Sequence, residues 1–202
     1  MESVTIEGVV ILAGGTARRL GGISKPDLEV ACRRLLDWQL DQVSRVAPEA
    51  TVVVVAPPQV QVPAAVVRVL EDPPFGGPVA GFAAGLAALR RAGVTDGLIG
   101  LATCDAPLAP ANYLGLVAAL EPGLDGAAPT TAAEDGTFPQ YALGVYRAGA
   151  LGKILPENAR NVSVKRTFSP AKLAFVPDVN RNCTDVDTWA DVKTLEGLLK
   201  LH

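Results

Sequence analysis

Short apolar runs alternate along the chain with longer stretches in which apolar positions recur three and four residues apart. The runs at residues 9–12, 51–56, 66–70 and 98–102 have the length and apolar character of buried strands in a parallel sheet. Weaker strand signals follow at residues 126–129, 140–146 and 173–176, whereas the polar, glycine-containing residues 134–139 give none. Helical spacing occurs at residues 35–47, after Pro78, at 110–120, at 148–155 and after residue 187.

Strands that alternate with helices predict a parallel sheet with helices on both of its faces. No linker, repeat or low-complexity tract interrupts this pattern, so we expect one domain over residues 1–202. The expected fold class is α/β, a three-layer α/β/α arrangement with a mainly parallel sheet. Thr184 and Asp187 have the spacing of a capping box before the last helix, whose inward face is predicted to carry Trp189, Val192, Leu195 and Leu199.

Composition narrows the class of function. Hydrophobic residues make up 49% of the chain and aromatic residues only 5%, so the core must consist mainly of alanine, valine and leucine. The net charge of -3 gives no field that would favour nucleic acid or an anionic membrane as a partner. No apolar run has the length of a membrane span, and we expect a cytoplasmic protein that is a monomer or a weak homo-oligomer.

Cysteine and histidine usage excludes several kinds of chemistry. The three cysteines are widely spaced and form no Cys-x-x-Cys pair, which argues against a disulfide framework and against a zinc site. Cys104 ends a predicted buried strand and is expected to act as a small apolar residue. The only histidine is the last residue, His202. A Ser-His-Asp or Cys-His mechanism is therefore excluded from the folded body, where carboxylates, lysine and backbone must carry the chemistry.

The loop after the first predicted strand combines glycines with positive charge. Gly14 and Gly15 allow a ligand to approach the backbone closely, and Arg18, Arg19 and Lys25 add cations to the same loop. Such a loop at the end of a strand is suited to binding phosphate. The spacing fits neither the Walker motif nor the dinucleotide fingerprint. The alternatives are a glycine-rich connector with solvated charges and, for Lys25, an ordinary surface lysine.

Asp105 follows the fourth apolar run and is the candidate metal ligand. Ligands of open α/β sheets bind beyond the carboxyl ends of the strands, where both the glycine loop and Asp105 are expected to lie. Magnesium prefers oxygen and needs only one or two carboxylates together with substrate phosphates. On sequence alone, a second interpretation is about as strong, namely that Asp105 caps the helix near Pro110.

These features together resemble a known family. The segments Leu12-Ala13-Gly14-Gly15, Arg19-Leu20-Gly21 and Lys25 resemble the opening loop of nucleotidyltransferases with a glycosyltransferase-A-like fold. Within that superfamily, Leu-Ala-Gly-Gly is similar to the molybdenum cofactor guanylyltransferases. The resemblance implies that Cys104-Asp105-Ala106-Pro107 places its aspartate on Mg²⁺. It also implies nucleotide binding by a set that includes Lys25: Leu12, Ala13, Gly14, Gly15, Arg19, Lys25, Asp72 and Gly77.

The acceptor side of the resemblance rests on shorter motifs. The stretch from Asn180 and Asn182 to Asp185 resembles the Asn-x-Asn-Thr-Pro-Glu segment that precedes the last helix of the family. Its cysteine and threonine depart from the usual Thr-Pro, and Phe138 replaces a histidine of the family. Arg160 is a candidate for gripping the acceptor phosphate, with a solvated basic surface as the alternative.

The resemblance implies a magnesium-dependent enzyme whose partners are GTP and molybdopterin or the molybdenum cofactor. A phosphate of the acceptor attacks the α-phosphate of GTP, and pyrophosphate leaves. This reaction needs no histidine base, because an ionised phosphate oxygen is already a competent nucleophile. The alternatives are a related cytidylyl- or sugar-phosphate nucleotidyltransferase and a non-catalytic nucleotide-binding protein.

Overall fold

The computed structural model describes residues 5–14, 16–17 and 22–200. Within these residues a central sheet of eight strands runs in the order β10-β9-β11-β8-β1-β6-β7, and β12 pairs with β9. The strands of this sheet are β1 (Ile6–Leu12), β6 (Thr51–Val55), β7 (Val67–Val69), β8 (Leu98–Thr103), β9 (Gly126–Ala133), β10 (Gly136–Pro139), β11 (Val145–Arg147) and β12 (Leu173–Pro177). Two short hairpins lie outside it, β2 (Thr16–Ala17) with β3 (Ile23–Ser24) and β4 (Glu29–Val30) with β5 (Arg33–Arg34).

The sheet is mainly parallel, which confirms the expected fold class. Strands β6, β7 and β8 join β1 in one parallel set, and β12 is parallel to β9. Strands β10 and β11 run opposite to the other strands, because β10 pairs antiparallel with β9 and β11 pairs antiparallel with β8 and β9. The polar segment predicted without a strand thus contains β10, and the strand predicted at 140–146 is confined to β11 after a 3₁₀ turn.

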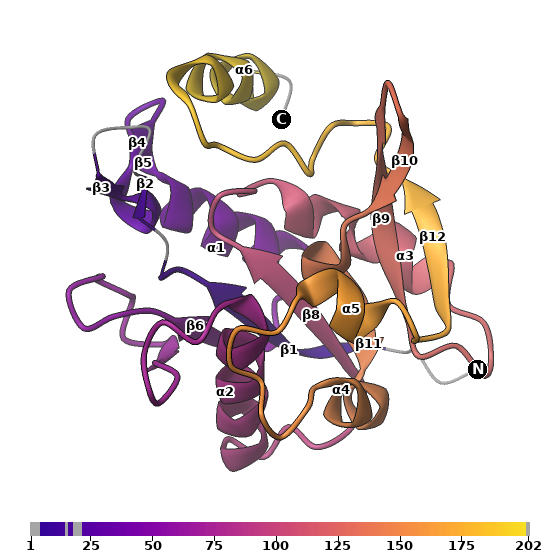
Figure 1. Cartoon of the computed structure of the whole chain (residues 1–202). Coiled ribbons are helices and arrows are strands. Elements are labelled where there is room, and N and C mark those ends of the chain that lie inside the picture. Colours follow the sequence, from indigo (N-terminus) through magenta and orange to yellow (C-terminus); the bar gives the residue numbers. More distant parts are fainter. Residues whose placement is uncertain (1–4, 15, 18–21, 201–202) are drawn as a thin grey trace.

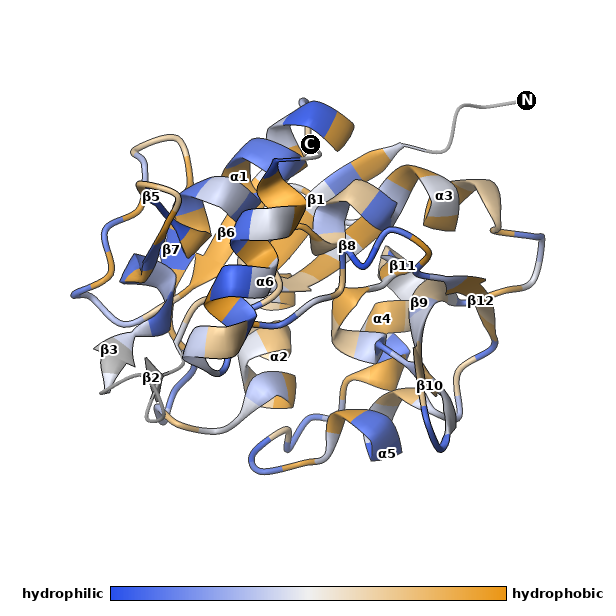
Figure 2. Ribbon diagram, turned by 90° about the horizontal axis from the view of Figure 1, so that it is seen from above, coloured by the Kyte–Doolittle hydropathy of each residue, from blue (hydrophilic) through white to orange (hydrophobic). Residues whose placement is uncertain are grey.

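Helices cover both faces of the sheet (Figure 1). They are α1 (Leu35–Val46), α2 (Pro78–Arg91), α3 (Tyr113–Ala118), α4 (Ala148–Ile154), α5 (Val164–Phe168) and α6 (Trp189–Leu199). Val9 and Ile11 of β1 pack in one apolar cluster with α1 and α3, whereas Val10 packs in a second cluster with α2, α4 and α5. Because successive strand residues point to opposite faces, this alternation places β1 in the middle of the three layers. Figure 2 shows the apolar character of the central strands.

Two glycines of α2 allow the helix to lie close to β1. A Cβ atom at Gly85 would lie 2.2 Å from Cγ1 of Val10, and one at Gly81 would lie 2.8 Å from Cδ2 of Leu12. The smooth strip that these glycines form on α2 therefore receives side chains of the strand. The close packing fixes the end of β1, from which the glycine loop departs.

Helix α6 packs away from the two main clusters, in a third one that contains the β4–β5 hairpin and the start of α1. It lies at the top of the view in Figure 1. Its capping box is formed by Thr188 and Asp191, and not by Thr184 and Asp187 as the sequence suggested. Trp189, predicted to face inward, is 57% exposed, whereas Val192 and Leu195 are buried as expected.

Candidate functional site

The ends of two neighbouring strands bring the glycine loop and Asp105 together. Strands β1 and β8 are parallel, with Leu12 paired to Thr103 at their carboxyl ends. The Cys104 amide then donates to the Leu12 carbonyl at 2.9 Å, which continues the pairing by one residue. Because Asp105 follows directly, it lies beside the start of the glycine loop, at the sheet edge where ligands of such folds bind. Burial raises the pKa of the Cys104 thiol, which agrees with the apolar role expected for it.

Lys25 forms the centre of a charge cluster at this edge. Its Nζ donates to Oδ2 of Asp105 at 3.2 Å and to Oδ1 of Asp187. Burial acts to lower the pKa of Lys25, but the hydrogen bond with Asp187 and the charge of Asp105 outweigh it, so the pKa is raised. The residue is only 9% exposed. Lys25 therefore remains a cation at neutral pH and is not a solvated surface lysine.

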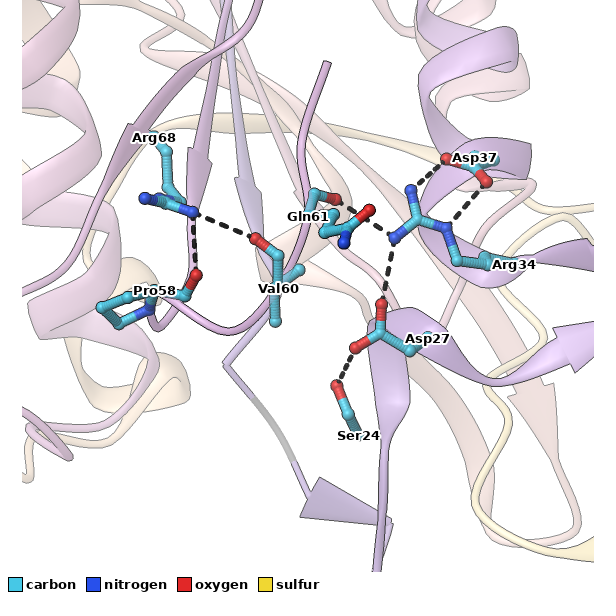
Figure 3. Close-up of polar contacts among 8 residues, drawn as sticks. All are labelled: Ser24, Asp27, Arg34, Asp37, Pro58, Val60, Gln61 and Arg68. Atoms are coloured by element: carbon cyan, nitrogen blue, oxygen red, sulfur yellow. Dashed lines mark hydrogen bonds and ion pairs between the residues drawn. The ribbon is translucent and has the colours of Figure 1, made fainter. Parts of the chain in front are cut away.

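A second ion-pair network fixes the backbone that carries Lys25 (Figure 3). The Arg34 guanidinium donates to both carboxylate oxygens of Asp37, at 2.9 and 2.7 Å, and to Asp27 at 3.0 Å. It also donates to the Gln61 carbonyl at 3.1 Å, while the Ser24 hydroxyl donates to Asp27 at 2.5 Å. The turn at residues 25–27 is thereby joined to α1 and to the loop after β6.

Asp187 is a site residue that the sequence interpretation missed. The Val186 amide donates to the Asp105 carbonyl at 2.8 Å, so the segment before α6 runs alongside Asp105. Thr188 and Asp191 cap α6, which leaves the Asp187 carboxylate available for Lys25. The residues directly before α6 are thus Asp185, Val186, Asp187 and Thr188, and Asn180 and Asn182 lie further from the helix. The signal that identifies Asp187 is its long-range contact with Lys25, which local spacing does not reveal.

Two cavities meet at Asp105. The first has a volume of about 440 Å³ and the second about 670 Å³, and both include Thr103 and Asp105 in their walls. The first cavity is lined by Leu12, Gly14, Lys25, Val55, Glu71, Phe75, Gly77, Pro78, Gly81, Thr103, Cys104 and Asp105. Asp105 is therefore shared by two adjoining binding spaces, an arrangement suited to transfer between two ligands.

Half of the residues predicted to bind nucleotide lie together in the first cavity. Four of the eight line it, namely Leu12, Gly14, Lys25 and Gly77, together with the predicted metal ligand Asp105. Ala13 is fully buried behind them, with its amide bonded to the Val55 carbonyl at 2.8 Å. Asp72 is exposed, and the neighbouring Glu71 lines the cavity. Gly15, Arg18 and Arg19 lie outside the described residues, so their predicted contacts stay predictions.

The three residues predicted to bind the acceptor line neither of the two cavities. Asn182 is 2% exposed, and its amide donates to Oδ1 of Asn112 at 2.8 Å. Asn180 is exposed, and Arg160 donates to the Pro73 and Pro74 carbonyls beside the first cavity. Among the described residues, the second cavity is lined by Thr103, Asp105, Ala106, Thr131, Ala132, Gln140, Ala142, Leu143, Asp178, Arg181, Cys183, Thr184, Asp185, Asp191 and Thr194. Acceptor binding by Asn180, Asn182 and Arg160 stays a prediction.

The carboxylates suit a divalent cation that is shared with a ligand. Within the described part of the chain, no group of three or more histidine, cysteine or acidic side chains is arranged to bind a metal by itself. Asp105 and Asp187 nevertheless converge, because one ammonium group contacts both. Two neighbouring carboxylates are a donor set that suits Mg²⁺ when substrate oxygens and water complete its coordination shell.

The fold and the site define a nucleotidyltransferase class, and comparison with known proteins agrees. Residues 9–169 match the MobA-like NTP transferase domain, and the chain belongs to this family. No curated protein shows a significant sequence match to the chain. None of the described helices combines the length and the apolar character needed to cross a membrane.

Solved structures share the fold at low sequence identity. Molybdopterin-guanine dinucleotide biosynthesis protein A from Archaeoglobus fulgidus is 19% identical, with a TM-score of 0.64 over 96% of this chain and 100% of its own. The 2-C-methyl-D-erythritol 4-phosphate cytidylyltransferase from Thermus thermophilus is 18% identical, with a TM-score of 0.69 over 97% and 100%. The 4-diphosphocytidyl-2C-methyl-D-erythritol synthase from Anaerococcus prevotii is 16% identical, with a TM-score of 0.71 over 98% and 100%.

Proposed function

We propose that this protein transfers GMP from GTP to the terminal phosphate of molybdopterin or the molybdenum cofactor and releases pyrophosphate. The observation that carries the proposal is the meeting of Lys25 with Asp105 at the boundary between two cavities. The first cavity is assigned to the nucleotide and the second to the acceptor. The choice of GTP and of a pterin acceptor follows from the family and from the resemblance of the glycine loop.

The first cavity offers separate surroundings for the phosphates and for the base. Gly14 and Lys25 line this cavity, and we assign the triphosphate to them, with the lysine neutralising its charge. Glu71 lies in the wall formed by the loop before α2. A carboxylate there accepts hydrogen bonds from the N1–H and the 2-amino group of guanine, which adenine and cytosine do not offer in the same arrangement. We therefore assign the reading of the base to Glu71, in the loop where the resemblance had implied nucleotide binding by Asp72.

Asp105 and Asp187 are the residues that would bind Mg²⁺ together with the triphosphate. The ion supplies charge neutralisation at the α-phosphate and at the leaving pyrophosphate. An acceptor phosphate oxygen forms a bond to the α-phosphorus while the bond to the β-phosphate oxygen breaks, and no proton transfer is needed. The chain contributes alignment of the two ligands on either side of Asp105 and removes charge repulsion between their phosphates.

Thermal shift measurements with four nucleotides and Mg²⁺ test the nucleotide assignment. A ligand at a hundred times its Kd stabilises a protein by about 2.7 kcal/mol, which for a chain of this size raises Tm by roughly 5–11 °C. GTP should give this rise, and CTP, UTP and ATP should give less. Equal or greater stabilisation by CTP would favour a cytidylyltransferase and defeat the guanylyl assignment.

The variant Asp105→Asn tests the carboxylate itself, with the exposed Asp96→Asn as a matched control. Asparagine caps a helix as well as aspartate does, so a capping role predicts little change. Loss of a preorganised electrostatic group instead predicts a fall in turnover of roughly a hundredfold to a thousandfold, measured as pyrophosphate released with molybdopterin as acceptor. Near wild-type turnover in Asp105→Asn would remove Asp105 from the catalytic site.

A further inference from the structure

Phe75 has a conformation that the fold itself does not explain. The residue is 86% exposed, although full burial of a phenylalanine side chain stabilises a protein by roughly 1.5–3 kcal/mol. Its backbone has a φ of +63°, in the left-handed region that bulky residues rarely adopt. Strained, exposed positions of this kind gather at ligand-binding sites. A contact between the Phe75 side chain and a bound ligand, which the free protein lacks, would account for both features.

The loop that carries Phe75 is fixed from both sides. Within the loop, the Gly76 amide donates to the Glu71 carboxylate at 3.3 Å. From the segment before α5, the Asn161 amide donates to the Gly76 carbonyl at 2.6 Å, and Arg160 donates to the carbonyls of Pro73 and Pro74 at 3.2 Å each. The exposed ring is thus presented by a loop with defined geometry.

Phe75 is one of the residues that line the first cavity. The wall combines apolar side chains, among them Leu12 and Val55, with the charged side chains of Lys25 and Asp105. A nucleoside triphosphate likewise combines a flat aromatic base with charged phosphates. The composition of the wall therefore matches a nucleotide, and Phe75 offers an aromatic surface for its base.

We propose that Phe75 is the stacking wall for the nucleotide base, whose flat face packs against the phenyl ring. This inference rests on the proposed function and adds a binding residue to it. Stacking depends on the area of the aromatic surfaces and does not read the edges of the base. Phe75 therefore supplies affinity that is greater for a purine than for a pyrimidine, while Glu71 distinguishes guanine from adenine.

The test is calorimetric titration of Phe75→Ala with Mg²⁺–GTP, with Mg²⁺–tripolyphosphate as a probe that lacks a base. Removal of a stacking aromatic costs about 1–3 kcal/mol per base, so the Kd for GTP should rise by roughly 5- to 150-fold. Affinity for tripolyphosphate should be unchanged, because Lys25 and Asp105 are unaltered in this variant. Phe75→Tyr should keep the GTP affinity, and Phe75→Leu, which has the same backbone demand without a ring, should lose most of it.

Phe175→Ala is the matched control, because Phe175 is a phenylalanine on β12 that is 51% exposed and belongs to the wall of neither cavity. Its affinity for GTP should equal that of the wild type. Unchanged GTP affinity in Phe75→Ala, or an equal loss of tripolyphosphate binding, would overturn the assignment of Phe75. A wild-type protein that binds tripolyphosphate but none of the four nucleoside triphosphates would instead overturn the proposed function.

Discussion

Replacing Lys25 with methionine removes one positive charge from between two carboxylates while keeping a side chain of similar length. The ammonium group lies 3.2 Å from Asp105 and also contacts Asp187. The Lys25 side chain is 11% exposed, but those of the two aspartates are 32% and 47% exposed. The variant leaves two carboxylates facing one another without a cation, so we expect it to be less stable than the wild type.

The magnitude follows from the geometry of the cluster. At an effective dielectric constant of about 20, unit charges 3.2 Å apart attract by roughly 5 kcal/mol, most of which is offset by the desolvation of the ions. Exposed pairs contribute about 0–1 kcal/mol, whereas breaking a buried pair costs about 3–5 kcal/mol. With the carboxylates partly exposed, we expect a loss of about 1–2 kcal/mol, which corresponds to a fall in Tm of roughly 2–8 °C for a chain of this size.

The pH dependence gives a second signature. The folded state raises the pKa of Lys25 above its ordinary value of 10.5, so the stabilisation is complete below that value and is lost as the pH rises through the folded pKa. The difference in unfolding free energy between wild type and Lys25→Met should therefore be constant from about pH 7 to pH 9 and should shrink above about pH 10.5. Chemical denaturation at several pH values measures it, with the exposed Lys153→Met as control.

Addition of Mn²⁺ without nucleotide completes the experiment. In the wild type the Lys25 ammonium competes with a metal ion for the two carboxylates, whereas in Lys25→Met they are free to bind it. Mn²⁺ should therefore raise the Tm of the variant more than that of the wild type. The reasoning would be refuted by a variant that equals the wild type in stability at pH 7 and responds to Mn²⁺ in the same way.

Two further predictions concern side chains that support the site. Gln39 is fully buried and donates to the carbonyls of Thr103 and Ala106, on either side of Asp105, at 2.8 and 3.3 Å. In Gln39→Met, denaturant titration should show that the free energy of unfolding falls by about 1–3 kcal/mol. Electron paramagnetic resonance in the presence of GTP should show that Mn²⁺ binds about 10- to 100-fold more weakly. Gln42→Met on the same helix should keep the wild-type Mn²⁺ affinity. Thr188→Ala should lower stability by about 1 kcal/mol in a denaturant titration through loss of the α6 cap, and a value equal to wild type would contradict the capping role.

The sequence predicted the centre of the sheet because buried parallel strands are apolar on both faces. The runs that became β1, β6 and β8 carry this signal, and the rule for carboxyl ends of neighbouring strands placed Lys25 and Asp105 at one edge. Strand β10 lacked the signal, because it is an edge strand with exposed residues that pairs only with β9. Its existence depends on pairing, which spacing along one strand does not reveal.

Asp187 could not be predicted from local pattern for a different reason. Both Thr184 with Asp187 and Thr188 with Asp191 have the spacing of a capping box. The choice between them depends on the complete burial of Val186 and on a contact between Lys25 and Asp187, which lie far apart along the chain. Long-range contacts of this kind decided both the start of α6 and the second carboxylate of the site.

The hydrogen bond from Val186 to Asp105 joins the site to a part of the chain that the family match does not include. The matched family domain ends at residue 169, whereas Val186 and Asp187 lie beyond that boundary. The second carboxylate that contacts Lys25 therefore comes from outside the matched region, on the segment that leads into α6. A variant truncated after residue 169 would keep Lys25 and Asp105 but would lose the paired aspartate.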